Sequence, residues 1–425
     1  MPAEKPHVLI DGTKLADASI DGIRRYLEEL LKALAEQIAQ GRPDWSIRVT
    51  IDSQTTYPLN EVIESLARLE EGTTLTLLDR RLAALRHRTN SLGQRLTRLR
   101  ARLERSVLKR WPQLGRHQGC GLIHLPLPNT YRLYSQHPAP MLVTVHDLSH
   151  LVCPEFQTPS NIASLENGLS GAIGRNASFL AVSESTKREM VELLDVPSQR
   201  IRVVHEASDS TRFQPVSDPQ VIHRLRQKYR LPEQPFVLTL CRLEPRKNLK
   251  AVVRACQQLF QTSPDLPFHL VIAGGGGWGN QADELAQLTS DRVHLTGPVD
   301  DADLAALYST ASAFTCMSFY EGFCLPILEA MGCGCPVIHS DTSAMPEVAQ
   351  GAGLAASPTD IDQIAQHIEA VLCDSELRKR LKDAGLARAS QFSWARAASE
   401  TMQMYETQFQ NAAIANRPTR LRAAA

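Results

Sequence analysis

Short apolar runs alternate with longer amphipathic stretches from one end of the chain to the other, and this alternation constrains the fold most. The runs expected as strands are residues 7–10, 122–125, 142–145, 179–182, 201–204, 236–240, 268–273, 293–295, 313–317 and 336–339. The stretches with helical periodicity are residues 23–39, 184–194, 249–259, 283–288, 303–311, 325–331 and 360–372. Strands and helices that alternate in this way form parallel sheets covered by helices on both faces. The sequence therefore predicts an α/β protein.

A polar, proline-bearing stretch divides this pattern into two halves, each about the size of one doubly wound domain. The chain has 425 residues, enough for two or three domains. We expect a first domain over residues 1–213, a linker over 214–235 and a second domain over 236–395. Residues 396–425 are expected to form a helix, which could return to the first domain, and a tail.

Composition excludes several classes of protein. The 46 Lys and Arg residues balance the 46 Asp and Glu residues, which excludes a globally basic nucleic-acid binder and a globally acidic tail protein. No apolar run approaches the ~18 residues that a transmembrane helix needs, and the N-terminus lacks the apolar core of a signal peptide. The nine cysteines are therefore expected to be reduced thiols in a cytoplasmic protein.

Residues 80–116 form a basic segment, with twelve Lys or Arg residues and one acid, Glu104. Leucines recur there at helical spacing between arginines, as in a basic amphipathic helix. One interpretation is docking on an anionic membrane surface or contact with an anionic acceptor. The other is a helix that packs on the first domain while its arginines face water. The segment lacks the interleaved aromatic residues typical of a nucleic-acid site, so no nucleic acid is expected as a partner.

Two blocks at expected strand ends carry residues suited to chemistry. In the first, Glu321 lies on a loop and Glu329 lies two turns into the following helix, so the two carboxylates can bind two places on one extended ligand with hydroxyl groups. Backbone N–H groups near Gly322 at the helix start favour an anion. In the second, Arg242 and Lys247 follow a strand and suit a diphosphate. Each block alone also fits an ordinary solvated loop or helix face.

Together these blocks resemble a known family. The order Arg242 then Lys247, the runs Ala273-Gly274-Gly275-Gly276 and Val293-His294-Leu295-Thr296-Gly297, the pair Glu321/Glu329 and the run Pro336-Val337-Ile338 are similar to the retaining nucleotide-sugar glycosyltransferases of group 1, family 4 type. The resemblance covers nearly all of the second half. It extends more weakly to Gly22-Ile23-Arg24-Arg25-Tyr26 and Val145-His146-Asp147. It implies the GT-B architecture, in which two Rossmann-like domains face each other across a cleft.

The resemblance also implies roles for individual residues. Arg242 and Lys247 would hold the donor diphosphate, and Glu329 would bind the donor ribose. Glu321 and His146 would lie on either side of the donor sugar. The other implied donor contacts are the backbone amides of Gly322, Phe323 and Cys324, the close approach allowed by Gly22, and the nucleobase edge formed by Gly297, Pro298 and Val299. Arg25 and Tyr26 are candidates for the acceptor side, although Tyr26 could equally be part of the core.

The sequence departs from the family pattern at several positions. Many members have glycine where Cys324 stands, so the cysteine there has either an ordinary negative φ or a strained positive one. Only one glycine, Gly22, stands in the first loop, where relatives often have two. The Asn-Gly pair that usually follows the last strand of the first domain is replaced by the run from His205 to Asp209, which receives no predicted role.

Other motif-like runs are poor evidence for cofactors. The run Gly274 to Gly279 matches G-x-G-x-x-G but lies late in the chain, so no dinucleotide is expected. Cys333 and Cys335 lack further ligands at metal-site spacing, and Asp301-Ala302-Asp303 is better explained as helix capping. We therefore expect no metal and no cofactor other than the nucleotide-sugar substrate.

The sequence thus predicts a metal-independent, retaining hexosyltransferase, cytoplasmic or peripheral on the inner face of a membrane. The subgroup with Gly-Ile-x-Arg-Tyr before the first helix often transfers mannose from GDP-mannose, and a glycan or lipid-linked acceptor in surface polysaccharide synthesis would fit. Two alternatives stay open: a sugar-nucleotide epimerase or hydrolase on the same fold, and a catalytically silent sugar-nucleotide-binding protein. The donor base, acceptor, linkage and oligomeric state depend on pocket details that the sequence does not reveal.

Overall fold

The first seven strands form one parallel sheet. The computed structural model describes residues 6–16, 21–41, 43–52, 73–78, 120–275 and 290–415. The first sheet has the order β3-β2-β1-β4-β5-β6-β7. Its strands are β1 (His7–Asp11), β2 (Ser46–Asp52), β3 (Thr73–Leu78), β4 (Cys120–Leu125), β5 (Met141–Val145), β6 (Ser178–Ala181) and β7 (Ile201–Val203). We call the body built on this sheet the first domain.

The last six strands form a second parallel sheet, in the order β10-β9-β8-β11-β12-β13. These strands are β8 (Phe236–Leu240), β9 (His269–Ala273), β10 (Val293–Gly297), β11 (Ala313–Cys316), β12 (Val337–Ser340) and β13 (Leu354–Ala356). In both sheets the strand order reverses direction beside the strand that comes first in the sequence, β1 or β8, as in doubly wound folds. The predicted fold class is confirmed, and we call the second body the second domain.

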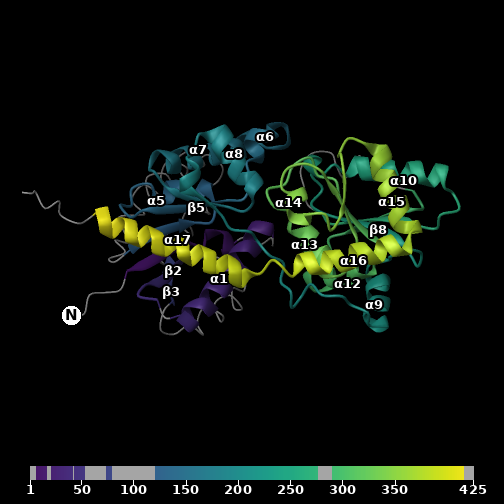
Figure 1. Ribbon diagram of the computed structural model, residues 1–425, viewed down its shortest axis with the longest axis horizontal. Helices are drawn as coiled ribbons and strands as arrows, with labels where there is room; N and C mark the ends of the chain where they lie inside the picture. Colours follow the sequence, from purple (N-terminus) through teal and green to yellow (C-terminus); the bar gives the residue numbers. More distant parts are fainter. Residues whose placement is uncertain are drawn as a thin grey trace, which may run out of the picture.

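Helices lie between these strands and cover the sheets. In the first domain they are α1 (Gly22–Gly41), α5 (Tyr131–Tyr134), α6 (Ser149–Val152), α7 (Pro159–Gly174) and α8 (Glu184–Leu194). In the second they are α9 (Pro219–Tyr229), α10 (Leu249–Thr262), α12 (Leu304–Thr310), α13 (Leu325–Gly332), α14 (Met345–Ala349), α15 (Ile361–Cys373) and α16 (Ser375–Ala389). Figure 1 shows the two domains side by side.

Apolar periodicity and capping explain why these helices form. One face of α1 carries the fully buried leucines Leu27, Leu30 and Leu34, and the Asp21 carboxylate accepts the N–H of Arg24 at 2.9 Å at its start. Helix α8 begins after Ser183, whose hydroxyl accepts the N–H of Thr186, as the sequence predicts. The central strands are buried on both faces, as helix-covered parallel strands should be.

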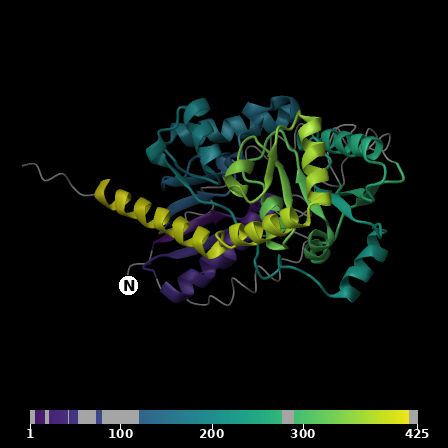
Figure 2. The same ribbon diagram turned by 45° about the vertical axis from the view of Figure 1, so that its right-hand side comes forward.

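The last helix, α17 (Trp394–Ala415), leaves the second domain and packs along α1 of the first. In Figures 1 and 2 it runs as a long yellow helix from the junction of the domains across the first domain. The Tyr405 hydroxyl lies 2.7 Å from Nδ1 of His124, and its ring packs edge-on against Trp45. The C-terminal segment therefore ties the second domain back to the first.

Several elements differ from the sequence-based expectation. Helix α9 lies inside residues 214–235, which we expected to be a linker, and it packs against α12. Strands β2, β3 and β13 and helices α7 and α16 were not predicted. The predicted helix at 283–288, most of the glycine run at 274–279 and the basic segment at 80–116 lie outside the described residues. Among the helices that the structure describes, none has the length and apolarity needed to cross a membrane.

Candidate active site at the domain interface

A buried cluster of opposite charges lies at the carboxyl end of the second sheet. The Lys247 ammonium lies 2.6 Å from one carboxylate oxygen of Glu321, and the Arg246 guanidinium lies 3.0 Å from the other. The hydroxyl of Ser318 donates to Glu321 at 2.7 Å. Lys247 ends the short helical turn Pro245–Lys247 after β8, and Glu321 lies on the loop between β11 and α13. The structure thus joins one residue from each of the two predicted blocks.

These contacts fix the charges of the cluster. Burial by itself would raise the pKa of Glu321, but the charges of Arg246 and Lys247 outweigh it and lower that pKa to about 2. Burial would lower the pKa of Lys247, yet the carboxylate of Glu321 holds it above its ordinary value. The site therefore presents a permanent ammonium and guanidinium around one carboxylate, and the positive charges exceed the negative charge of Glu321.

Arg242 reaches this cluster indirectly. Its side chain is 55% exposed, and its Nε lies 3.3 Å from a carboxylate oxygen of Glu244. The other oxygen of Glu244 lies 3.8 Å from Arg246. Glu244 therefore links Arg242 to the buried cations. Arg246 received no predicted role from the sequence, yet it contacts Glu321 directly. Arg242 is connected to Glu321 through Glu244 and Arg246.

Glu329 lies on α13, beyond the loop that carries Glu321, and it contacts a different set of residues. One of its carboxylate oxygens lies 2.6 Å from the Arg25 guanidinium of the first domain. The other accepts the hydroxyl of Tyr308 at 3.0 Å. Arg25 also contacts Asp301 at 2.7 Å, and Arg212 contacts the other carboxylate oxygen of Asp301 at 3.0 Å. Asp301 was expected to cap a helix, but its carboxylate instead joins the two domains.

Arg25 is therefore placed differently from the sequence-based expectation. It was a candidate for the acceptor side, but it faces Glu329, the residue expected to bind the donor ribose. Tyr26 is 2% exposed, and its hydroxyl lies 3.1 Å from that of Thr144 inside the first domain. Burial raises the pKa of the Tyr26 phenol. The position of Tyr26 favours the core alternative over contact with an acceptor.

The loop after β5 brings His146 to the same interface. A Cβ on Gly322 would lie only 1.7 Å from the backbone oxygen of His146, so the two loops are in backbone contact. The Oγ1 of Thr186 donates to the carbonyl of Gly322 at 3.3 Å. Gly322 is thus required by the close approach of the first domain. This contact brings His146 and the Glu321 loop together, as the resemblance implies.

The His146 ring is held by the first domain. Its Nδ1 lies 2.9 Å from Glu206, its Nε2 lies 3.1 Å from the carbonyl oxygen of Pro126, and Tyr26 packs edge-on at 4.6 Å. The Pro126 carbonyl only accepts, so this contact is a hydrogen bond in the tautomer that carries a proton on Nε2. Glu206 comes from the run to which no role was assigned, and no local motif in the sequence could have identified it, because it lies 60 residues from its partner.

The glycines and Cys324 serve different purposes. Around Gly22, a Cβ would meet nothing within 4 Å of the described protein atoms, so its proposed close approach to the donor phosphate stays a prediction. Gly297 ends β10 with φ of 71°, a conformation that glycine adopts without strain. Cys324 has φ of 81° and is therefore the strained alternative.

The side chain of Val299 packs against the core, and the Phe323 ring packs against Phe392.

A cavity of about 310 Å³, lined mostly by polar residues, also lies at the interface. Its lining includes His205, Glu347, Arg388 and Phe392 but neither Lys247 nor Glu321. Glu347 of the second domain accepts the N–H of Glu184 at the start of α8 and lies 2.7 Å from Nε2 of His205. Glu206, which holds His146, also lines this cavity, and the contacts of Glu347 hold the two domains together.

Comparisons with known proteins agree with this architecture. Residues 221–388 match the family model described as glycosyl transferases group 1. O-antigen chain mannosyltransferase B of Escherichia coli is 36% identical over 270 residues, which cover 62% of this chain and 70% of the relative. The chain belongs to the group 1 glycosyl transferases. A serotype-specific mannosyltransferase, WbdA of Escherichia coli, is 33% identical over 228 residues, but these cover 53% of this chain and only 28% of WbdA.

Solved structures of glycosyltransferases share the fold. Anabaena Alr3699/HepE in complex with UDP and glucose aligns with a TM-score of 0.69 and 17% identity, over 94% of this chain and 99% of that one. WaaG, a glycosyltransferase involved in lipopolysaccharide biosynthesis, aligns with a TM-score of 0.65 and 14% identity, over 93% and 99% of the two chains. The predicted GT-B architecture of this glycosyltransferase is thereby confirmed.

Proposed function

We propose that this glycosyltransferase transfers mannose from GDP-mannose, with retention of anomeric configuration, to a glycan or lipid-linked acceptor in surface polysaccharide synthesis. The main support is the cluster of Lys247 and Arg246 around Glu321, in contact with the His146 loop of the opposite domain. The mannosyltransferase names of two relatives and the sequence Gly22-Ile23-Arg24-Arg25-Tyr26 favour mannose.

The cations suit the leaving group of such a reaction. As the sugar–phosphate bond breaks, negative charge grows on the diphosphate and positive charge grows on the sugar ring. Lys247, with Arg242 at the exposed edge of the cluster, would bind the diphosphate and stabilise it as it leaves. Arg246 would keep Glu321 ionised and oriented towards the hydroxyls of the donor sugar. The preorganised cations would therefore stabilise the transition state more than the ground state.

Retention places the acceptor on the face from which the diphosphate leaves. The departing phosphate would then accept the proton of the acceptor hydroxyl, so no protein base is needed on that face. His146, held by Glu206 and Pro126, would line the opposite side of the sugar. Contact between the Gly322 and His146 loops would exclude water that could hydrolyse the donor.

Donor binding is the first test of this proposal. A ligand that binds the folded state raises its apparent stability, so a thermal-shift screen with UDP-, GDP- and ADP-sugars identifies the base and sugar. We expect the largest shift with GDP-mannose. Incubation of that donor with an acceptor panel, followed by NMR of the product, then gives the anomeric configuration. An inverted product would contradict retention.

The same assay separates the alternative functions. Isomerised donor or free sugar in place of a glycoside would indicate an epimerase or a hydrolase. Donor binding without turnover across the acceptor panel would indicate a silent binding protein. Metal independence is tested in parallel, because activity that persists in excess EDTA supports it and activity restored only by Mg²⁺ or Mn²⁺ refutes it.

We also propose that the protein acts at an anionic membrane surface, the interpretation that the basic composition of residues 80–116 supports. Binding to vesicles that contain phosphatidylglycerol should fall steeply when Arg95, Arg98 and Arg102 are changed to Glu. The control reverses three exposed basic residues of the second domain, Lys379, Arg380 and Arg254. If both triple variants bind as the parent does, residues 80–116 are not a membrane anchor.

A further inference from the structure

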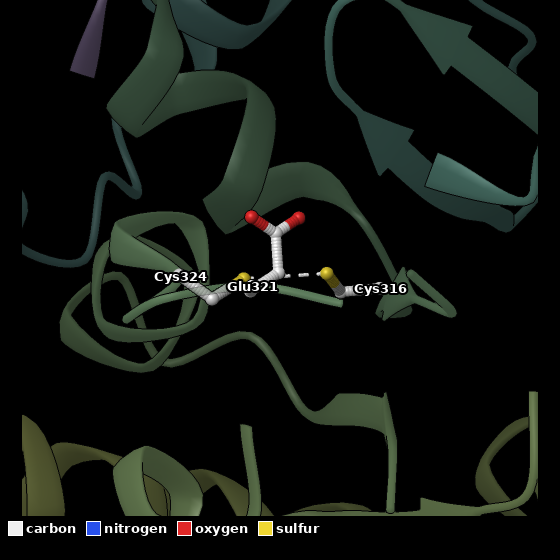
Figure 3. A group of neighbouring side chains, drawn as sticks. All are labelled: Cys316, Glu321 and Cys324. Atoms are coloured by element: carbon white, nitrogen blue, oxygen red, sulfur yellow. Dashed lines mark hydrogen bonds between the residues drawn. The ribbon is translucent and has the colours of Figure 1, made fainter. Parts of the chain in front are cut away.

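Two thiols face each other beside the charged cluster. The sulfur of Cys316, the last residue of β11, lies 3.3 Å from the sulfur of Cys324, which directly precedes α13. Figure 3 shows the two sulfurs directed towards each other, while the carboxylate of Glu321 extends to one side of the line that joins them. All nine cysteines lie among the described residues, and all nine are free thiols.

Cys324 stands where its backbone disfavours it. A non-glycine residue at φ of 81° and ψ of 62° carries backbone strain, which glycine would remove. The side chain is 7% exposed and contacts Cys316. The strained cysteine therefore has a partner that a glycine at the same position would lack.

Cys316 is the more reactive thiol of the pair. Cys324 hydrogen-bonds to it and thereby lowers the pKa of the Cys316 thiol, and the charge of Lys247 acts in the same direction. Burial of the Cys316 thiol and the charge of Glu321 oppose this shift but do not reverse it. The Cys316 residue as a whole is half-buried, whereas Cys324 is buried. A thiol with a lowered pKa, a cation nearby and a second sulfur at 3.3 Å is the kind that takes part in thiol–disulfide exchange.

A metal ion is a weaker explanation of this group. The two sulfurs and a Glu321 oxygen lie within 4.8 Å of one another, which could suggest a site for a soft cation. However, the Glu321 carboxylate already accepts from Lys247, Arg246 and Ser318. A cation would have to displace these contacts beside two fixed positive charges. Thiol chemistry needs no such displacement.

We propose that Cys316 and Cys324 form a redox-sensitive dithiol. Its oxidation by a small disulfide displaces Glu321 and weakens binding of the donor. The Cys316 thiolate attacks one sulfur of the small disulfide and releases the first small thiol. Cys324 then loses its proton, attacks Cys316 and releases the second. In sum, the protein loses two protons and two electrons and gains one S–S bond, and the small disulfide is reduced to two thiols.

Oxidation should affect the donor because Glu321 lies between the two cysteines in the chain. The sulfurs must move from 3.3 Å apart to about 2.05 Å, so the loop that carries Glu321 has to shift. Glu321 is held 2.6 Å from Lys247, and misplacement by about 1 Å in such a site is enough to lower activity by about 100-fold. This consequence rests on the proposed donor site, whereas formation of the bond does not.

Two readouts test the proposal. The protein is incubated with oxidised glutathione, alkylated and digested without reduction. We expect a peptide with a Cys316–Cys324 bond and a mass about 2 Da below that of the reduced form. In the same samples the thermal shift with GDP-mannose should indicate donor affinity at least tenfold weaker, and dithiothreitol should restore it.

Matched variants make the outcome decisive. Cys316→Ser and Cys324→Gly should abolish both the bond and the response to glutathione, and Cys324→Gly does so while removing the backbone strain. Cys373→Ser, which removes an exposed thiol elsewhere, should leave the response unchanged. Failure of the bond to form in the parent protein overturns the proposal, and so does a bond that leaves donor affinity unchanged. If the reduced parent binds no nucleotide-sugar at all, the proposed function fails, but peptide mapping still decides whether the dithiol oxidises.

Discussion

The Lys247 ammonium of one loop and the Glu321 carboxylate of another meet at 2.6 Å at the carboxyl end of the second sheet. The two residues lie 74 positions apart in the sequence, yet both follow strands of the same parallel sheet. Such sheets bind ligands at this edge. The pair therefore locates the proposed donor site.

The charge of Glu321 predicts a specific dependence of stability on pH. Its pKa falls from 4.5 to about 2 on folding, so its contribution to stability is complete above about pH 5 and is lost as the pH falls towards 2. We expect the contribution of Glu321 to the free energy of unfolding to be about 1 kcal/mol smaller at pH 4 than at pH 7. Urea unfolding at both pH values should show a smaller difference for Glu321→Gln than for the parent. Equal differences would contradict the assigned pKa.

The ion pair of Arg25 and Glu329 predicts a cost when one partner is removed. Glu329 is 3% exposed, so Arg25→Ala leaves a buried carboxylate whose remaining side-chain partner among the described residues is the Tyr308 hydroxyl. We expect a loss of about 2–3 kcal/mol in the free energy of unfolding. Arg212→Ala removes the contacts of Arg212 with the half-exposed Asp301 and with the Phe213 ring, and it should lose less than about 1 kcal/mol. Equal losses would refute the special role of the Arg25 pair.

The close packing around Gly322 predicts that a larger residue there hinders closure of the domains. A Cβ there would overlap the backbone oxygen of His146, which cannot move as a flexible side chain would. Gly322→Ala should therefore hold the domains apart, raise the radius of gyration in small-angle X-ray scattering and reduce transfer by at least tenfold. Gly174→Ala, where a Cβ meets nothing within 4 Å, is the control. An unchanged radius and rate for Gly322→Ala would contradict this account.

The contact between Glu206 and His146 predicts that Glu206 positions the His146 ring. It holds Nδ1 of His146 at 2.9 Å, so Glu206→Gln should disturb the ring without touching the donor phosphates. We expect kcat to fall about tenfold with little change in the donor KM, and the pH profile of kcat to change shape. Glu192→Gln, on the exposed face of α8, should change neither. A rise in KM alone would show that Glu206 acts on binding.

The fold could be predicted largely because apolar periodicity is local. Helix α8 was expected at residues 184–194 and is observed there, from Glu184 to Leu194. Helix α7 was missed because it buries only Gly168, Leu169 and Ala172, too few for an apolar stripe. Strand β13, with three residues, is too short to give a pattern.

The site was less predictable because its contacts join distant parts of the chain. Arg25 was expected near the acceptor, yet its partner Glu329 lies 304 residues away, and no local pattern reveals such a pair. The close contact of Gly322 with the backbone of His146, where the domains meet, joins residues 176 positions apart in the sequence. Motifs predicted candidate residues such as Glu321 and Lys247, whereas the structure was needed to show partners such as Arg246 and Glu206.

The central claim is that Lys247 helps to bind the diphosphate of a nucleotide-sugar. Its most direct test is the thermal shift produced by GDP-mannose in the parent protein, in Lys247→Ala and in Lys379→Ala, which removes an exposed lysine of α16. We predict a clear shift for the parent and for Lys379→Ala and none for Lys247→Ala. A shift of parental size in a folded Lys247→Ala variant would contradict the account.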